Sequence, residues 1–184
     1  NNMMLVGHNT VRTLVMGAAK GPPNQTQMAA MKDHVRRALE QGACGFSTGL
    51  IYRPGRYSAT EEVIELACEA EAYDALYATH MRNEGNHLLR AVEESLHIAK
   101  SSNVHLHISH HKAAGPANWG KVRDSLALVD QAMADGQRVT LDVYPYTAGS
   151  GRMIEYFDLQ KIDPVLASSI RIASCPACRA YEGR

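Results

Sequence analysis

Apolar positions along the chain follow two periods, one typical of helices and one typical of strands. Stripes at intervals of three and four residues predict helices around residues 28–39, 63–70, 88–96 and 122–133. Short apolar or alternating runs predict strands at residues 10–16, 43–48, 76–80, 104–110 and 139–143. Asn24 with Gln27, and Ser58 with Glu61, have the spacing of capping boxes at two helix starts.

The strands and helices alternate, and the connections between them are short. Such alternation predicts an α/β fold in which a parallel sheet is covered by helices. Five strands within about 140 residues match the pitch of a (β/α)8 TIM barrel, which needs roughly 250 residues to close. We therefore expect an incomplete barrel over residues 1–150, and a further barrel helix or strand segment over 151–184. A doubly wound open sheet is the competing architecture, disfavoured because no glycine-rich phosphate loop follows the first strand.

Two histidines fall at the ends of successive predicted strands, and they are the strongest chemical signal in the chain. His80 closes the run from Leu76, and His110 closes the run from Val104. Because side chains alternate between the two faces of a strand, we expect His80 to share a face with Leu76, and His110 to share a face with Val104. Parallel neighbours end at the same edge of a sheet, where α/β enzymes keep their active sites. Because imidazole is the commonest metal ligand, the pair predicts a metal site, although a lone strand histidine is more often structural.

The remaining histidines of the second run have a different expected role. His105, His107 and His111 fall on the other face of their strand, where we expect them to pack or to form hydrogen bonds.

Composition narrows the class of protein. The 184 residues carry 19 basic and 19 acidic side chains, so the net charge is zero and no basic run suggests a nucleic-acid partner. No apolar stretch approaches the roughly 18 residues that cross a membrane, and no signal-peptide pattern is present. We expect a cytoplasmic protein without a membrane partner.

The four cysteines do not form a disulfide framework in a chain of this length. Cys44 and Cys68 are expected as small core residues. Cys175 and Cys178 form a CxxC motif, but a second ligand pair is missing, so the motif is weak evidence for a metal or redox site.

Five motifs, taken together, resemble one enzyme family. They are LVGH (5–8), GFSTGL (45–50) with YRPG (52–55), YATHMRNEG (77–85), ISHHK (108–112) with NWG (118–120), and DVYPYTAGS (142–150). The set is similar to the N-acyl-D-amino-acid deacylases, or D-aminoacylases, of the amidohydrolase superfamily. The resemblance covers residues 1 to about 150 closely and the rest more loosely.

The resemblance implies a zinc-dependent (β/α)8 barrel, of which this chain would span about strands three to seven. It implies hydrolysis of the amide bond in a small N-acyl-D-amino acid. Carried over by position, the implied roles are zinc ligands for His80 and His110, carboxylate binding for Lys112, Tyr144 and Ser150, and a place near the scissile carbonyl for Tyr52. Arg82 and Glu84 are expected to form a structural ion pair beneath the metal. The preferred D-amino-acid side chain and the oligomeric state are not implied.

Several parts of the family pattern lie outside this chain. They are a His-x-His pair on the first strand, a cysteine ligand on the second and a catalytic aspartate on the eighth. We therefore expect the full-length parent to be the enzyme and this segment alone to be inactive. Two alternatives remain open: a related cyclic-amide hydrolase of the dihydroorotase or hydantoinase type, and a non-catalytic, truncated barrel fragment.

Overall fold

The computed structural model describes residues 2–151 and 164–184, which fall into two compact units, Asn1–Tyr146 and Thr147–Arg184. The first unit is built on a parallel sheet of five strands in the sequential order β1-β2-β3-β4-β5. Its elements are β1 (Leu5–Gly7), α1 (His8–Met16), α2 (Gln25–Glu40), β2 (Gly45–Gly49), α3 (Thr60–Glu71), β3 (Leu76–His80), α4 (Leu88–Ser102), β4 (His105–Ile108), α5 (Lys121–Ala134) and β5 (Val139–Leu141). Short 3-10 helices lie at Gly55–Tyr57 and Pro116–Asn118.

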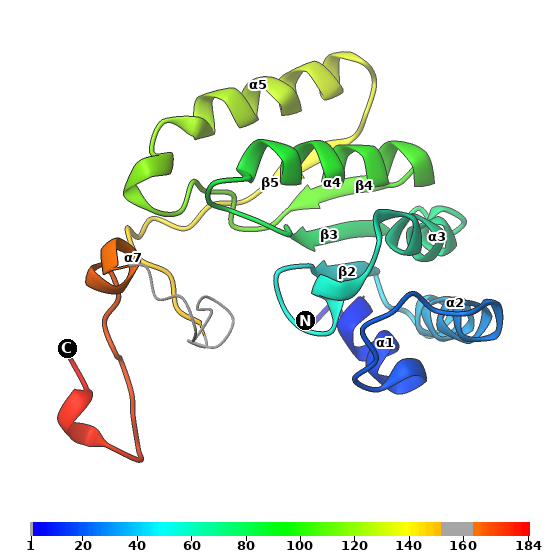
Figure 1. Cartoon of the computed structure of the whole chain (residues 1–184). Coiled ribbons are helices and arrows are strands. Elements are labelled where there is room, and N and C mark those ends of the chain that lie inside the picture. The colour runs from blue at the N-terminus through cyan, green and yellow to red at the C-terminus, as the bar shows by residue number, and fades with distance from the viewer. Residues whose placement is uncertain (1, 152–163) are drawn as a thin grey trace. The chain divides into compact units, whose positions relative to one another are not determined.

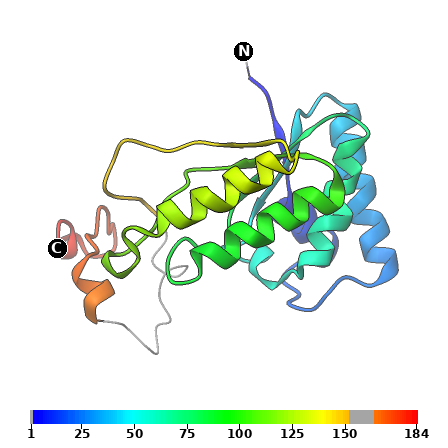
Figure 2. The same ribbon diagram turned by 90° about the horizontal axis from the view of Figure 1, so that it is seen from above.

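Helices α2 to α5 lie on one side of the sheet, in the order in which they follow the strands (Figure 1). Figure 2 shows α4 and α5 side by side along this layer. The core lies between the two layers, where Phe46, Tyr77 and Leu106 of the strands are fully buried. A doubly wound sheet would reverse its strand order at a switch point, and the described strands have no such reversal.

The opposite face of the sheet, called here the inner face, carries a row of residues in register. Ser47 pairs with Ala78, Ala78 with His107, and His107 with Thr140. Partners in a parallel ladder point to the same side, so His107 and Thr140 share this face with His80 two residues beyond Ala78. The inner face thus carries the polar residues Ser47, His80, His107 and Thr140, whereas the helix-covered face carries the large side chains of the core.

A strand was expected at residues 10–16, but this segment is the helix α1. The strand lies just before it, at Leu5–Gly7. The β-branched residues favoured a strand locally, but His8, Val11 and Arg12 are buried at helical spacing and decide the structure.

Side-chain contacts confirm one capping box and contradict the other. The Asn24 side chain accepts from Gln27 N–H, and Gln27 Oε1 accepts from Asn24 N–H, both at 2.9 Å. At α3 the N-cap is Ala59, and the Ser58 hydroxyl instead donates to Gly55 O.

Two residues expected in the core are exposed. Met133 of α5 is 51% exposed, because Ala132 takes the buried position of the last turn. Cys68 points to solvent, and Cys44 is half-buried with its Sγ 3.3 Å from Met4 O.

A buried ionic cluster joins α1 to α3. The Glu62 carboxylate accepts hydrogen bonds from His8 Nε2, at 2.8 Å, and from Arg12 Nη1. His8 and Arg12 are completely buried and Glu62 is 4% exposed. Arg12 also donates to Gly21 O at 2.6 Å, so the loop before α2 is tied to the same guanidinium.

The second unit contains the helix α7 (Pro164–Ser168) and a 3-10 turn at Arg179–Tyr181. All four cysteines of the chain are free thiols. Cys178 N–H donates to Cys175 O, and Cys175 N–H donates to Glu182 Oε1. The assignment of residues 151–184 to a further barrel segment stays a prediction. Among the helices described in either unit, none combines the length and apolar character of a membrane span.

Candidate metal centre

His80 and His110 meet at the carboxyl-terminal edge of the sheet, as the sequence predicted. His80 is the last residue of β3, and His110 follows the end of β4 by two residues. Their ring atoms Nδ1 and Nε2 lie 2.9 Å apart. With Glu84 they form the one group of possible metal ligands found among the described residues, with ligand atoms within 4.8 Å of one another.

The path by which His110 reaches this group differs from the prediction. Register places His105 and His107 on the inner face with His80, and Leu106 and Ile108 on the helix-covered face. Strict alternation would therefore send His110 to the wrong side. The strand ends at Ile108, and His110 adopts a left-handed backbone with φ of 41°, which redirects its side chain.

Glu84 was expected beneath the metal in an ion pair with Arg82, and the structure gives it other partners. The expected pair with Arg82 is wrong, because Arg82 binds Glu94 at 2.9 Å and donates to Ser58 O. Glu84 Oε1 instead lies 2.6 Å from Lys112 Nζ and 2.9 Å from His110 Nδ1. One feature of the sequence indicates that Glu84 belongs to the site: it follows His80, the last residue of β3, by only four positions.

Lys112 lies at the centre of this arrangement. Its Nζ donates to Glu84 Oε1 at 2.6 Å and to His110 O at 2.9 Å. Its charge also lies 5.4 Å from the centre of the Tyr144 ring, within the range of a cation–π contact. Lys112 and Tyr144, which the resemblance assigns to carboxylate binding, are therefore brought together beside the two histidines.

The environment of His80 keeps its imidazole neutral. Burial lowers the pKa of His80 to about 4, and the nearby His110 and Lys112 act in the same direction, whereas Glu84 opposes them. At neutral pH the ring therefore offers a lone pair, as a metal ligand must. Its Nε2 is buried without a hydrogen-bond partner among the described residues and lies 4.0 Å from Glu84 Oε1.

These donors fit a divalent metal such as zinc. Two imidazoles with a carboxylate beside one of them suit zinc, which binds imidazole nitrogens at about 2.0–2.1 Å. Two nitrogens on one tetrahedral zinc lie about 3.3 Å apart, so the observed 2.9 Å needs only a small outward shift of the rings.

The other predicted site residues differ in how closely they approach the centre. The Tyr52 ring packs against the His80 ring with centroids 4.7 Å apart and planes tilted by 49°. Ser150 belongs to the second unit, and its role stays a prediction.

The neighbouring histidines form hydrogen bonds, as expected. His111 is buried and its Nε2 lies 3.0 Å from Ser125 Oγ. His107 Nε2 lies 2.8 Å from Asp142 Oδ2, and this hydrogen bond is the main reason that the pKa of Asp142 lies below its usual value. His105 Nε2 lies 3.1 Å from Thr140 Oγ1.

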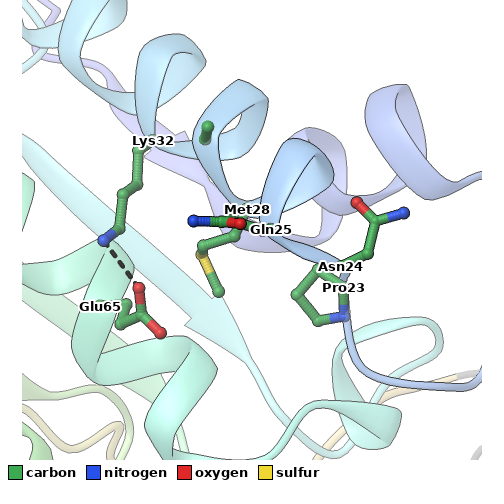
Figure 3. A pocket seen from close by; sticks show the side chains of 7 residues that line it. Pro23, Asn24, Gln25, Met28, Lys32 and Glu65 are labelled. Carbon is green, nitrogen blue, oxygen red and sulfur yellow. Dashed lines mark ion pairs between the residues drawn. The ribbon is translucent and has the colours of Figure 1, made fainter.

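A shallow hollow of about 430 Å³ lies elsewhere, between the start of α2 and α3 (Figure 3). It is lined by Pro23, Asn24, Gln25, Met28, Ala29, Lys32 and Glu65. Lys32 Nζ and Glu65 Oε2 form an ion pair across it at 2.7 Å, and the Asn24 side chain caps the start of α2. None of these residues belongs to the metal centre, and the hollow has no group arranged for chemistry.

Comparison with known sequences supports the resemblance. No family model matches the chain. A D-aminoacylase of Alcaligenes xylosoxydans xylosoxydans is 43% identical over 150 residues, which is 82% of this chain and 31% of that protein. An N-acyl-D-glutamate deacylase of the same organism is 42% identical over 154 residues, 84% of this chain and 32% of the relative. The chain thus spans about a third of the length of the curated relatives it matches.

Solved structures give the same result. A crystal structure of D-aminoacylase, described as defining a novel subset of amidohydrolases, has a TM-score of 0.85 at 39% identity and matches 98% of this chain and 36% of that one. An N-acyl-D-glutamate deacylase from Bordetella bronchiseptica, solved with zinc and a phosphonate inhibitor, has a TM-score of 0.77 at 41% identity and matches 79% of this chain and 31% of that one. By sequence and by fold, the chain belongs to the N-acyl-D-amino-acid deacylase (D-aminoacylase) family of amidohydrolases.

Proposed function

We propose that this chain supplies the central strands of a (β/α)8 barrel, with part of its metal and substrate sites, in a zinc-dependent enzyme that hydrolyses N-acyl-D-amino acids. The observation that carries the proposal is the convergence of His80, His110 and Glu84 within 4.8 Å at the carboxyl ends of neighbouring strands. The sequential strand order supports the barrel, because each new strand is added at the same edge of the sheet.

The residues of the chain have separate tasks in this proposal. A zinc ion, when bound, would activate a water molecule as the nucleophile and polarise the amide carbonyl. His80 and His110 would hold it, and Glu84 would orient the His110 ring through Nδ1, 2.9 Å away. Tyr52, beside the His80 ring, would donate its phenolic hydrogen to the carbonyl oxygen as negative charge develops there.

The substrate carboxylate would bind on the Lys112 side of the centre. The Lys112 ammonium and the Tyr144 ring lie together there, and a carboxylate would share Lys112 with Glu84. Ser150 would add a hydroxyl donor.

Free thiols at all four cysteines favour a reducing compartment such as the cytoplasm.

The test separates metal binding from turnover. Zinc titration by calorimetry on the 184-residue chain should show one site of weak affinity, which His80→Asn and His110→Asn remove. His97→Asn, at an exposed position of α4, is the matched control. Hydrolysis of N-acetyl-D-amino acids should require a full-length protein that contains this chain, with the L-enantiomers as control substrates. A full-length protein that binds zinc but cleaves neither enantiomer would contradict the proposed activity.

A further inference from the structure

The ladder between β4 and β5 contains one extra residue, at His110. In a regular parallel ladder, the N–H of a residue donates to a carbonyl on the adjacent strand. The C=O of the same residue accepts from the N–H that lies two positions after that carbonyl on the adjacent strand. Asp142 N–H donates to Ile108 O at 3.1 Å, but Asp142 O accepts from His111 N–H at 2.8 Å rather than from His110. His110 is therefore a bulge residue, which agrees with its left-handed φ of 41°.

The Asp142 side chain binds the amide that the bulge releases. Its Oδ1 accepts from His110 N–H at 2.5 Å, and its Oδ2 accepts from His107 Nε2 at 2.8 Å. His107 is held in turn by Thr140 Oγ1, 2.9 Å from its Nδ1. Both carboxylate oxygens are thus engaged, and the Asp142 backbone is itself anchored by bonds to Ile108 O and from His111 N–H.

We infer that Asp142 is a positioning residue that fixes the backbone of His110 and thereby aims its imidazole at His80. A left-handed backbone is unfavourable for a residue with a Cβ, and it persists where surrounding bonds hold it. The bond from Asp142 supplies that restraint at the residue whose ring must meet His80 within 2.9 Å. This inference rests on the proposed metal centre, and it adds to its support a residue that directly follows a third strand, β5.

The carboxylate of Asp142 is not itself a member of the ligand group. The metal-ligand cluster among the described residues contains His80, Glu84 and His110. Asp142 acts on that group through the backbone amide of His110.

The experiment compares Asp142→Ala, Asp142→Asn and the matched control Asp130→Ala, which removes an exposed carboxylate from α5. In 1H–15N NMR of the 184-residue chain, the His110 amide proton should resonate downfield in the wild type because of its bond to Asp142, and it should move upfield in Asp142→Ala. Zinc affinity measured by calorimetry should fall about 10–100-fold in the same variant. Asp142→Asn should restore most of both, because its side-chain oxygen can still accept from His110, and Asp130→Ala should change neither.

The outcomes distinguish the two proposals. Far-UV circular dichroism confirms that each variant is folded before titration. Wild-type zinc binding that Asp142→Ala leaves unchanged would overturn the inference alone. Absence of zinc binding by the wild-type chain would overturn the metal centre and, with it, this inference.

Discussion

His80 and His110 are 30 positions apart in the sequence, yet their ring nitrogens Nδ1 and Nε2 lie 2.9 Å apart. Two different backbone arrangements produce this closeness. His80 ends a regular strand, whereas His110 lies in a bulge with a left-handed backbone. The pair therefore depends on the register of β3 and β4 and also on the contacts that hold the bulge.

Glu84→Gln should weaken zinc binding about 10–100-fold without unfolding the protein. Glu84 Oε1 lies 2.9 Å from His110 Nδ1 and pairs with Lys112. A neutral amide in its place makes the imidazole less basic and leaves the lysine charge beside the metal. Calorimetric titration with zinc measures the change. Glu93→Gln, at an exposed position of α4, serves as the control, and equal affinities in the two variants would exclude this role for Glu84.

Tyr52→Phe should lower kcat of the full-length enzyme by about 10²–10³ with little change in KM. The substitution removes the hydroxyl but keeps the ring that packs on His80 at 4.7 Å, so zinc content should be preserved. Steady-state kinetics with N-acetyl-D-methionine provide the measurement. Tyr73→Phe, at an exposed tyrosine, controls for loss of a phenol, and a rise in KM at constant kcat would point to ground-state binding instead.

Lys112→Met should raise KM for N-acetyl-D-methionine roughly tenfold to a hundredfold in the full-length enzyme, since a charged hydrogen bond contributes about 1.5–3 kcal/mol. The methyl ester of the same substrate lacks the carboxylate and should be affected far less. Lys100→Met, at an exposed lysine of α4, is the control. An equal loss on acid and ester would mean that Lys112 acts through Glu84 and His110 and not on the substrate.

Much of this architecture could be predicted from the sequence because apolar periodicity is a local signal. The stripes of α2, α3 and α4 and the strand that ends at His80 follow from it, whereas the face on which the His110 side chain lies does not. The segment after Leu5 could not be read in this way. Its valines and threonines favour a strand, but His8, Val11 and Arg12 are buried at helical spacing, and the partner of Arg12 is Glu62, 50 residues away.

The supporting residues of the site are also non-local. Glu84 was expected to pair with Arg82 beneath the metal, but Arg82 binds Glu94 and Glu84 binds Lys112. The bulge at His110 is held by the carboxylate of Asp142, the residue that directly follows β5. A single sequence carries no sign of an inserted residue in a ladder, so the strand was expected to alternate regularly up to His110.

Glu62→Gln should lower the free energy of unfolding by about 3–5 kcal/mol, because it leaves the buried Arg12 guanidinium without its counter-charge. Arg12 is completely buried and Glu62 is 4% exposed, so water cannot replace the lost partner. Urea denaturation followed by circular dichroism measures the difference. Glu61→Gln, at an exposed position in the same first turn of α3, should cost less than about 1 kcal/mol. Comparable losses in both variants would show that the cluster does not stabilise the fold.

The same carboxylate predicts a pH dependence of stability. Burial by itself raises the pKa of Glu62, but the hydrogen bonds from His8 and Arg12, with their charge interactions, outweigh it and lower the pKa below its ordinary 4.5. A carboxyl group whose pKa is lower in the folded state stabilises that state above the unfolded pKa, and the contribution disappears as the pH falls through the folded value. The difference in unfolding free energy between wild type and Glu62→Gln should therefore be largest above pH 4.5 and narrow at lower pH. Urea denaturation at a series of pH values tests this. A difference that stays constant as the solution is acidified would mean that the ionised carboxylate is not the stabilising form.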